Sequence, residues 1–433
     1  MVLKKNNFIR GQYTPPGDKS ISHRVLILSS QSVGKSKIKN LLEGQDVINT
    51  LKVMKQLGAN IKKLNNQYIV YGVPPGALFQ PKKKLDFGNS GTGIRLIMGL
   101  VASNNIRTIL VGDKSLSNRP MKRVTNHLEK SGAIVKLRKN LYPPIQIIGS
   151  PNLIPLTYNI TIPSAQIKSA IMLSALNTNG LVKIKEFKTT RNHTENMLKA
   201  MNYNIKVKED KSYRYIEMRS NKHLTPLNYT VPGDPSSAAF FITAACMLPG
   251  SKLFVKNMLF NKTRIGFIDT LRKMGGNIKV KNIRKTNFET VADIEINQIK
   301  NLKAIVLEEN KIPLQVDEIP ILSIAASFAL GKSVFKGLKE LTVKESNRLL
   351  LIKKNLLNIG VSVEIKNSYD LHINGCLSLK NGGAKIVHHH DHRIVMSFYL
   401  ANLICKKNNI IDDKSSVKTS YPTFFKHFRE LFH

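Results

Sequence analysis

The sequence predicts an α/β fold of two lobes, each built from three copies of one repeated unit. Three observations lead to this prediction. Six helix openings recur at nearly constant spacing, a second kind of helix follows each of the first five, and the pattern Pro-Gly-Asp-x-Ser occurs twice. A chain of 433 residues is also too long for one ordinary hydrophobic core.

Each of the six openings is a short polar or Gly-rich stretch that passes directly into an apolar run. Their anchor residues are spaced by 71 to 82 positions, which indicates one supersecondary unit used six times. Because these runs are apolar almost all round, we expect six buried helices. The openings begin at Asp18, Gly88, Pro163, Gly233, Val316 and His389.

The second kind of helix is amphipathic, stops at a Gly or Asn and passes into a β-like run. Glycine at such a stop fits the left-handed position that ends a helix. We therefore expect a sheet layer outside the buried helices. These segments are 51–63, 127–137, 195–208, 269–281 and 351–366, and the glycines are Gly58, Gly132, Gly275 and Gly360.

The two Pro-Gly-Asp-x-Ser segments, 16–20 and 232–236, lie three units apart and mark where the chain passes between lobes. We predict one discontinuous lobe of residues 1–17 plus 235–433 and a second lobe of residues 18–234, with an active-site cleft between them.

Composition narrows the function classes. The chain has no apolar run of the ~18 residues that a membrane helix needs, no signal-like N-terminus, and only three scattered cysteines, so a cytoplasmic protein is expected. The net charge of +39 suggests an acidic partner. Because the lysines are spread along the chain, Trp is absent and aromatic residues are 7%, small anionic substrates are favoured over nucleic acid or a membrane.

Helix N-termini attract phosphate and carboxylate, so the openings are candidate anion sites. Ser, Asp and Asn there are also ordinary N-caps. Arg24, Arg95 and Arg393 interrupt apolar runs, where an arginine without a partner would be costly. Arg119 precedes Pro120 in a polar loop. Residues 343–348 predict a helical turn with Lys344 and Arg348 on one face, and surface ion pairing is the alternative there.

Three other segments do not match the binding motifs that they resemble. The segment Gly34-Lys35-Ser36 has Ser29 where a P-loop needs glycine, and GNSGTG lacks the dinucleotide spacing. The run His388–His392 could ligate a metal, but consecutive residues do not share a helix face. No metal and no cofactor is expected.

The ordered segments resemble those of the 3-phosphoshikimate 1-carboxyvinyltransferase (EPSP synthase) family over nearly the whole chain. That resemblance implies an inside-out fold of two lobes, each with three βαβαββ units around buried parallel helices. The segments are GDKSISHR (17–24), GNSGTGIR (88–95), LSNRPM (116–121), PSAQIKSA (163–170), TRNHTENM (190–197), VDEIP (316–320), VKESNR (343–348) and DHRIVM (391–396).

The resemblance implies transfer of the enolpyruvyl group of phosphoenolpyruvate to the 5-hydroxyl of shikimate 3-phosphate, with release of phosphate, on the route to aromatic amino acids. It also assigns residues to the two substrates. For shikimate 3-phosphate they are Lys19, Ser20, Arg24, Ser164, Ala165, Gln166, Asp317 and Lys344. For phosphoenolpyruvate they are Lys19, Gly91, Arg119, Gln166, Arg348, Arg393 and Lys418. Of these, Arg348 and Arg393 would bind its carboxylate.

The chemistry needs a base for the hydroxyl and an acid for the methylene carbon. The resemblance gives Asp317 the first role and Glu345, with Lys19, the second. The sequence departs from the family in part: Ala165 replaces a Ser, Glu340 stands where some members have an Asn, and Lys418 lies one residue off the family's lysine.

Two alternatives stay open. A UDP-N-acetylglucosamine enolpyruvyl transferase shares the donor, but commonly has a Cys in the loop that corresponds to 115–121, where this chain has none. A basic RNA-binding protein on related repeats would not need Asp317 and Glu345, and its binding would weaken steeply with salt. A monomer is expected.

Overall fold

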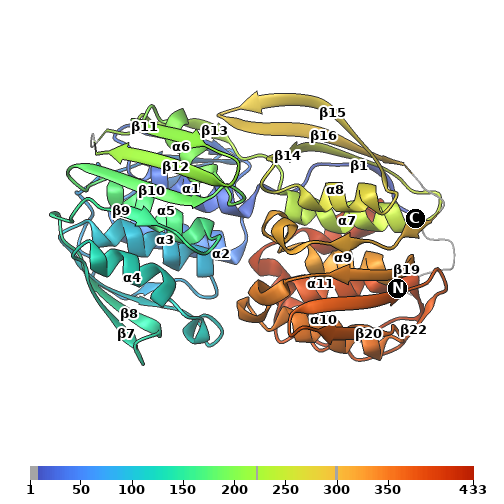
Figure 1. Ribbon diagram of the computed structural model, residues 1–433. Helices are drawn as coiled ribbons and strands as arrows, with labels where there is room; N and C mark the ends of the chain where they lie inside the picture. Colours follow the sequence, from blue (N-terminus) through green and yellow to red (C-terminus); the bar gives the residue numbers. More distant parts are fainter. Residues whose placement is uncertain (1–7, 221–222, 298–300) are drawn as a thin grey trace. The chain divides into compact units, whose positions relative to one another are not determined.

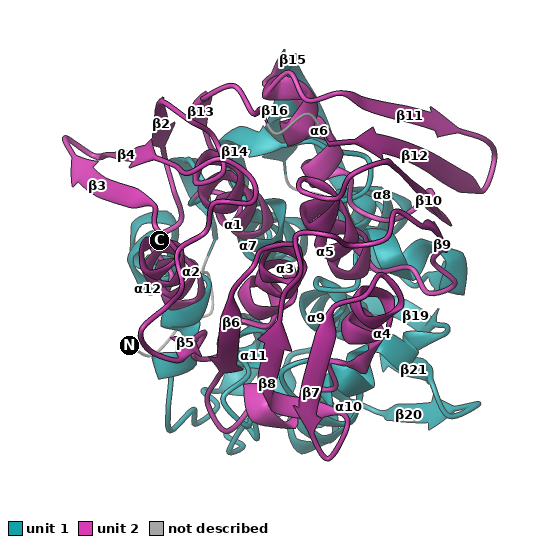
Figure 2. Ribbon diagram, turned by 90° about the vertical axis from the view of Figure 1, so that its left-hand side faces the viewer, with its two compact units in different colours: residues 1–16, 232–285, 290–433 teal, residues 17–231, 286–289 magenta. Residues whose placement is uncertain are grey.

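The computed structural model describes residues 8–220, 223–297 and 301–433, which form two compact units. Unit 1 comprises residues 1–16, 232–285 and 290–433, and unit 2 comprises residues 17–231 and 286–289 (Figure 2). Residues 1–7 of the predicted first lobe lie outside the described residues. Gly17 falls in unit 2 and residues 232–234 fall in unit 1, a shift of a few positions from the predicted joints. The prediction did not include the short segment 286–289, which leaves unit 1 and returns to it.

Unit 2 holds three four-stranded sheets, in the orders β13-β2-β4-β3, β5-β6-β8-β7 and β11-β12-β10-β9 (Figure 2). The strands of the last sheet, β9 to β12, are also labelled in Figure 1. The strands are β2 (Lys35–Lys39), β3 (Asn60–Leu64), β4 (Gln67–Tyr71), β5 (Leu85–Asp86), β6 (Arg107–Val111), β7 (Ile134–Arg138), β8 (Tyr142–Ile148), β9 (Thr157–Asn159), β10 (Leu181–Phe187), β11 (Ile205–Glu209), β12 (Tyr213–Arg219) and β13 (Asn228–Thr230). The helices are α1 (Lys19–Ser29), α2 (Gln45–Gln56), α3 (Gly91–Ala102), the 3-10 turn η1 (Leu116–Asn118), α4 (Lys122–Lys130), α5 (Ala165–Ala175) and α6 (His193–Ala200).

Unit 1 holds a four-stranded sheet in the order β1-β14-β16-β15, a five-stranded sheet built on β17-β19-β21-β20 with β18 beside β19, and the pair β22-β23. The strands are β1 (Arg10–Tyr13), β14 (Lys252–Leu259), β15 (Asn277–Thr286), β16 (Glu289–Asn297), β17 (Leu302–Lys303), β18 (Val306–Leu307), β19 (Ala329–Phe335), β20 (Val363–Lys366), β21 (Asp370–Gly375), β22 (Lys380–Gly382) and β23 (Cys405–Lys407). The helices are α7 (Pro235–Met247), α8 (Gly266–Lys273), η2 (Glu309–Leu314), α9 (Ile319–Ser327), η3 (Leu338–Val343), α10 (Arg348–Asn358), α11 (His392–Ala401), η4 (Asn402–Ile404), η5 (Ser415–Thr419) and α12 (Phe424–Leu431).

The four-stranded sheets of unit 2 share one arrangement. In each, an edge strand runs parallel to its neighbour, and the next two pairings are antiparallel. The register of the first sheet shows how distant segments meet, because β13 pairs with β2 through Tyr229 and Ile38. The chain is therefore a mixed α/β protein with several small mixed sheets.

The six predicted helix openings are confirmed. Five of the helices begin just after a residue whose side chain accepts a hydrogen bond from a free N–H of the first turn, as an N-cap does. These caps are Asp18, Ser90, Ser164, Asp234 and Asp391. The sixth helix, α9, follows Glu318, whose side chain makes no such bond.

The predicted glycine stops are also confirmed, because Gly58, Gly132, Gly275 and Gly360 all have φ between +87° and +111°. That backbone conformation is the left-handed one that lets a helix end and the chain turn into a strand. After α6, Asn202 takes the same role, with φ of +54°.

The prediction that residues 343–348 form a helical turn is wrong. Lys344 has an extended backbone at the end of η3, and α10 begins only at Arg348. The reason is local: the side chain of Asn347 accepts a hydrogen bond from the N–H of Leu350, which fixes the helix start at Arg348.

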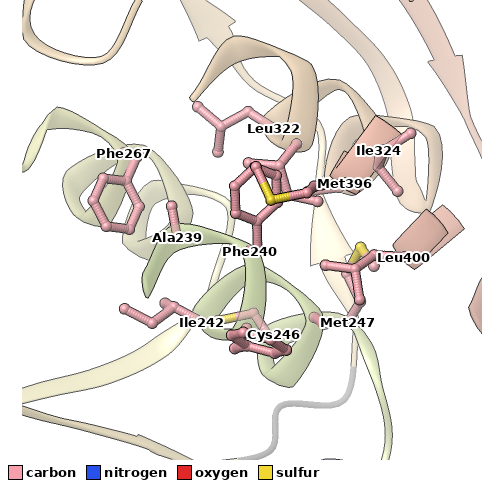
Figure 3. Packing of buried hydrophobic residues seen from close by; sticks show 14 of the residues in the cluster. Ala239, Phe240, Ile242, Cys246, Met247, Phe267, Leu322, Ile324, Met396 and Leu400 are labelled. Atoms are coloured by element: carbon pink, nitrogen blue, oxygen red, sulfur yellow. The ribbon is translucent and has the colours of Figure 1, made fainter. Parts of the chain in front are cut away.

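The core of unit 1 is made by its three apolar helices. All thirteen residues of α7 are buried, and α7, α9 and α11 pack against one another. Figure 3 shows Phe240 of α7 beside side chains of the other two helices, with Leu322 and Met396 labelled. Burial on all sides explains why these helices lack a polar face.

Within the described ranges, no helix combines the length and the apolar character needed to cross a bilayer.

Candidate active site

The N-terminus of α1 carries three predicted residues in unit 2. Asp18 accepts a hydrogen bond from the N–H of Ile21 at 2.8 Å, so Lys19 and Ser20 form the first turn of the helix. The Lys19 ammonium makes an ion pair with Asp46, which follows the start of α2. Both Lys19 and Ser20 stay half-buried.

Arg24 lies one turn further along α1 and is buried, with 3% exposure. Its Nε donates to Thr194 Oγ1 at 2.8 Å, one terminal nitrogen donates to Ser169 Oγ at 2.8 Å, and the other to the carbonyl of Ser20 at 2.9 Å. These bonds supply the partners that an arginine in an apolar run needs. They also join α1 to α5 and α6.

Arg191 belongs to the same group but received no role in the sequence analysis. It lies in the loop before α6, and its guanidinium donates to Ser20 Oγ at 3.3 Å. The signal was present in the segment TRNHTENM, which carries part of the family resemblance. Its position beside Ser20 could not be inferred from the pattern because the two residues are 171 positions apart.

A second group of predicted residues meets at the N-termini of α3 and α5. The Gln166 side chain accepts a hydrogen bond from Arg95 at 3.1 Å and donates to Thr92 Oγ1 at 3.1 Å. A Cβ atom at Gly91 would lie 3.0 Å from a terminal nitrogen of Arg119 and 3.0 Å from one of Arg95. Gly91, Arg119 and Gln166 are therefore brought together, with Arg95 linking them.

Arg119 is held in this place by the polar loop that precedes it. Its guanidinium donates to the Asn89 carbonyl at 3.3 Å and to Ser115 Oγ at 3.1 Å. The side chain is buried, with 7% exposure. These bonds place the guanidinium beside the start of α3.

Ser164 and Ala165 lie at the start of α5. Ser164 caps the helix by accepting from the N–H of Ile167 at 3.4 Å, and Ala165 is the first helical residue. Both are adjacent to Gln166, so all three lie at one helix N-terminus.

In unit 1, Arg348 donates hydrogen bonds to three carboxylates. Its Nε donates to Asp391 Oδ2 at 2.8 Å, and its terminal nitrogens donate to Glu345 at 2.5 Å and to Asp317 at 3.4 Å. Arg348 is 1% exposed and Asp391 is fully buried. Burial favours the neutral form of both groups, but the ion pair outweighs it, so the pKa of Arg348 is raised and that of Asp391 is lowered.

Arg393 meets the same aspartate from the start of α11. Its guanidinium donates to the backbone carbonyl of Asp317 at 3.1 Å and lies 3.7 Å from Glu318 Oε1. Asp317 is thus the common neighbour of Arg348 and Arg393. The structure brings Asp317, Glu345, Arg348 and Arg393 into one cluster.

Lys344 is half-buried beside this cluster. Desolvation lowers the pKa of its ammonium below the usual 10.5, and the positive charge of Arg348 acts in the same direction, against Asp317, Glu340 and Glu345. Glu340, the departure from the family's Asn, is therefore close enough to Lys344 to act on its charge.

Lys418 lies apart from these contacts. It is exposed in η5, which packs on α11, the helix that begins next to Arg393. Its role stays a prediction.

The histidine run was weighed as a metal site. The ring nitrogens of His388 and His390 lie within hydrogen-bond distance of Asp412 and Asp413, at 2.9 and 3.0 Å. Across residues 8–220, 223–297 and 301–433, no group of three or more His, Cys, Asp or Glu side chains is placed to hold a metal ion.

Asp391 is the main residue that the sequence analysis missed in unit 1. It was named only as the first residue of the segment DHRIVM. Because aspartate is an ordinary N-cap, its second role as the buried partner of Arg348 could not be read from the sequence.

The chain was compared with known proteins. The family model of EPSP synthase (3-phosphoshikimate 1-carboxyvinyltransferase) matches residues 3–428. A 3-phosphoshikimate 1-carboxyvinyltransferase of Zymomonas mobilis subsp. mobilis is 42% identical over 436 residues, which cover 100% of this chain and 96% of the relative. One of Pseudomonas sp. strain PG2982 is 42% identical over 425 residues, covering 98% and 94%.

The fold is similar to those of solved enolpyruvyl transferase structures. EPSP synthase from Acinetobacter baumannii superposes with a TM-score of 0.86 at 35% identity, over 100% of this chain and 98% of that one. The enolpyruvyl transferase NikO from Streptomyces tendae superposes with a TM-score of 0.74 at 14% identity, over 99% and 96%, which is a likeness of fold alone. The resemblance found in the sequence is confirmed, and the chain belongs to the EPSP synthase family.

Proposed function

We propose that this protein transfers the enolpyruvyl group of phosphoenolpyruvate to the 5-hydroxyl of shikimate 3-phosphate and releases inorganic phosphate, a step in the biosynthesis of aromatic amino acids. The full-length family match supports this reaction. The observation that carries the mechanism is that Asp317 and Glu345 share one buried guanidinium, that of Arg348. Two carboxyl groups held side by side suit a reaction that needs both a base and an acid.

Phosphoenolpyruvate is bound, in this proposal, by two groups of arginines. Its phosphate is taken by Arg119 and Gln166 beside Gly91, where the N-terminus of α3 adds a partial positive charge. Its carboxylate is taken by Arg348 and Arg393, which meet at Asp317. The contact of Arg348 with Asp317 is the longest of its ion pairs, so a substrate carboxylate can replace it at the least cost.

Shikimate 3-phosphate is taken by Lys19, Ser20 and Arg24 at the start of α1 and by Ser164, Ala165 and Gln166 at the start of α5. Arg191 joins this set because its guanidinium lies against Ser20. Lys344 assists near the reacting hydroxyl, where its lowered pKa eases the transfer of a proton. Lys344 belongs to unit 1, and the other residues of this set belong to unit 2.

The chemistry proceeds by addition and elimination. Asp317 takes the proton of the 5-hydroxyl while the hydroxyl oxygen bonds to C2 of phosphoenolpyruvate, and Glu345, with Lys19, supplies a proton to C3. The tetrahedral intermediate then loses phosphate from C2 and returns a proton from C3 to Glu345, which restores the double bond. No metal or organic cofactor enters this scheme, because the leaving group is already on the substrate.

The architecture proposed for this function is six βαβαββ units, three in each lobe, around buried parallel helices. The shared strand arrangement of the unit 2 sheets and the recurring cap positions support it. We further propose a cytoplasmic monomer without a nucleic-acid partner. The spread of the lysines along the chain supports the last point.

Phosphate release tests the proposed function. The purified chain is given phosphoenolpyruvate with shikimate 3-phosphate, with UDP-N-acetylglucosamine, or alone. Release that depends on shikimate 3-phosphate supports the proposal, whereas release with the nucleotide sugar assigns the chain to the other acceptor. Tight binding of RNA that weakens steeply with salt, without any phosphate release, would favour the RNA-binding alternative.

A further inference from the structure

A cluster of four buried charged side chains lies under the loop that carries Arg191. We define the buried charge cluster as Lys168, Glu186, Glu195 and Arg214, which are at most 2% exposed. Lys168 is on α5, Glu186 on β10, Glu195 on α6 and Arg214 on β12. None of the four belongs to the residues assigned to either substrate.

Lys168 uses all three of its ammonium protons inside this cluster. Its Nζ donates to Glu186 at 2.6 Å, to Glu195 at 2.7 Å and to the backbone carbonyl of Arg191 at 2.8 Å. The third bond fixes the main chain of Arg191 at the point where its side chain departs toward Ser20.

Arg214 holds the residues just before Arg191 in the same way. Its guanidinium donates to the carbonyl of Thr190 at 3.0 Å and to the carbonyl of Lys188 at 3.2 Å, and it also pairs with Glu186 at 2.9 Å. The hydroxyl of Thr190 donates to Glu186 as well. The loop 188–191 is therefore fixed by buried charges through three of its carbonyl groups.

Glu195 is stabilised as a carboxylate by its two basic neighbours. Burial alone raises the pKa of Glu195, but Lys168 and Arg214 outweigh burial and leave that pKa below its usual value. Buried ion pairs of this kind add little net stability compared with apolar residues of the same volume. A role in fixing the geometry of the loop accounts for their presence better than stability does.

From this geometry we infer that Lys168 is a positioning residue for the acceptor: it holds the main chain of Arg191 so that the guanidinium stays beside Ser20, ready for an anionic group of shikimate 3-phosphate. This inference rests on the acceptor role proposed above for Arg191. Lys168 itself does not touch the substrate. It acts through the carbonyl of Arg191, and Glu186 and Glu195, which accept hydrogen bonds from its ammonium, hold it in place.

A double-mutant cycle tests the inference. Lys168→Met, Arg191→Ala and the double variant are compared with the unchanged enzyme for kcat, for the KM of each substrate and for melting temperature. We expect Lys168→Met to raise the KM for shikimate 3-phosphate by about tenfold while the KM for phosphoenolpyruvate changes by less than about twofold. In the Arg191→Ala background the same substitution should have no further effect on either KM, because the guanidinium that Lys168 positions is gone.

Two controls separate positioning from loss of stability or charge. Met172→Ala removes a buried side chain from the same helix, α5, without touching the loop. Lys183→Met removes an exposed cation from β10, which pairs with Glu217 at 3.8 Å on the surface. If Lys168→Met does not fold, the charge-balanced variant Lys168→Met with Glu195→Gln carries the same expectation.

The outcomes distinguish the two claims. Equal rises in both KM values, a rise matched by Met172→Ala at the same melting temperature, or additive effects in the double variant would overturn the role of Lys168. An Arg191→Ala enzyme with an unchanged KM for shikimate 3-phosphate would overturn the acceptor role of Arg191 and the inference with it. Failure of the proposed function appears separately, as an unchanged enzyme that does not consume shikimate 3-phosphate.

Discussion

Arg348 and Asp391 form a buried ion pair in which Asp391 receives both Nε at 2.8 Å and a terminal nitrogen at 3.3 Å. The same carboxylate caps α11 by accepting the N–H of Arg393 at 3.0 Å. One side chain therefore fixes both arginines that we assign to the donor's carboxylate. The charge of Asp391 pairs with Arg348, and the same side chain caps α11, the helix that carries Arg393.

Substitutions at Asp391 should separate these two effects. Asp391→Ala removes the charge and the cap and should lower the free energy of unfolding by about 3–5 kcal/mol, because Arg348 loses its main buried partner. Asp391→Asn keeps the cap and should lose about 1 kcal/mol less. Urea denaturation measures both values, and equal losses would show that the cap contributes nothing.

Asp317 is tested by a change that keeps its shape. Asp317→Asn should lower kcat by roughly 10²–10⁴ while shikimate 3-phosphate still binds, because an amide cannot take the hydroxyl proton. Steady-state kinetics and titration calorimetry give the two quantities. Normal turnover together with normal binding would reduce Asp317 to a structural partner of Arg348 and Arg393.

The forked shape of Arg393 is tested separately from its charge. Arg393→Lys should raise the KM for phosphoenolpyruvate by at least about tenfold and spare that for shikimate 3-phosphate, because lysine keeps the charge but loses bidentate binding. Lys37→Met, which removes an exposed lysine of β2, is the control for bulk charge. If both substrates are affected alike, or if the control has the same effect, Arg393 does not grip the donor.

Gly91 is expected to be sensitive to a single methyl group. A Cβ there would lie 3.0 Å from both Arg95 and Arg119, so these guanidiniums must shift by a few tenths of an ångström. Gly91→Ala should therefore raise the KM for phosphoenolpyruvate by about tenfold. The KM for shikimate 3-phosphate is the internal reference, and a change confined to it would contradict the donor assignment.

The buried His23 should make the free energy of unfolding depend on pH. Burial lowers its pKa well below 6.5, and Lys19 and Arg24 act in the same direction. Below pH 6.5 the unfolded chain binds a proton that folded His23 does not, so stability falls as the pH falls. His23→Gln, which can still bond to Thr50, should lose about 1.4 kcal/mol less than the unchanged protein between pH 7.5 and 5.5. Urea unfolding at both pH values gives this difference, and equal losses would contradict it.

The local features of this fold could be predicted because short segments determine them. The cap at Asp18 and the left-handed turn at Gly58 need only a few neighbouring residues. The failure at 343–348 is local too, since capping by Asn347 competes with the helix that the charge spacing suggested. Both kinds of decision are made within one turn of chain.

The partners inside the site could not be predicted in this way. Arg348 and Asp391 are 43 positions apart, and Arg24 and Thr194 are 170 apart. The sequence shows that such arginines need partners, but only the packing of separate units determines which ones they meet. The buried charge cluster was missed for the same reason, because its members come from four different elements.

Enolpyruvyl transfer by this protein is tested by phosphorus NMR of the complete reaction. With equal amounts of phosphoenolpyruvate and shikimate 3-phosphate, we predict that the enol phosphate signal is replaced by inorganic phosphate in step with consumption of the acceptor. The acceptor's ester phosphate should shift without being released. Inorganic phosphate formed from the ester of shikimate 3-phosphate, or from phosphoenolpyruvate without an acceptor, would contradict enolpyruvyl transfer by this protein.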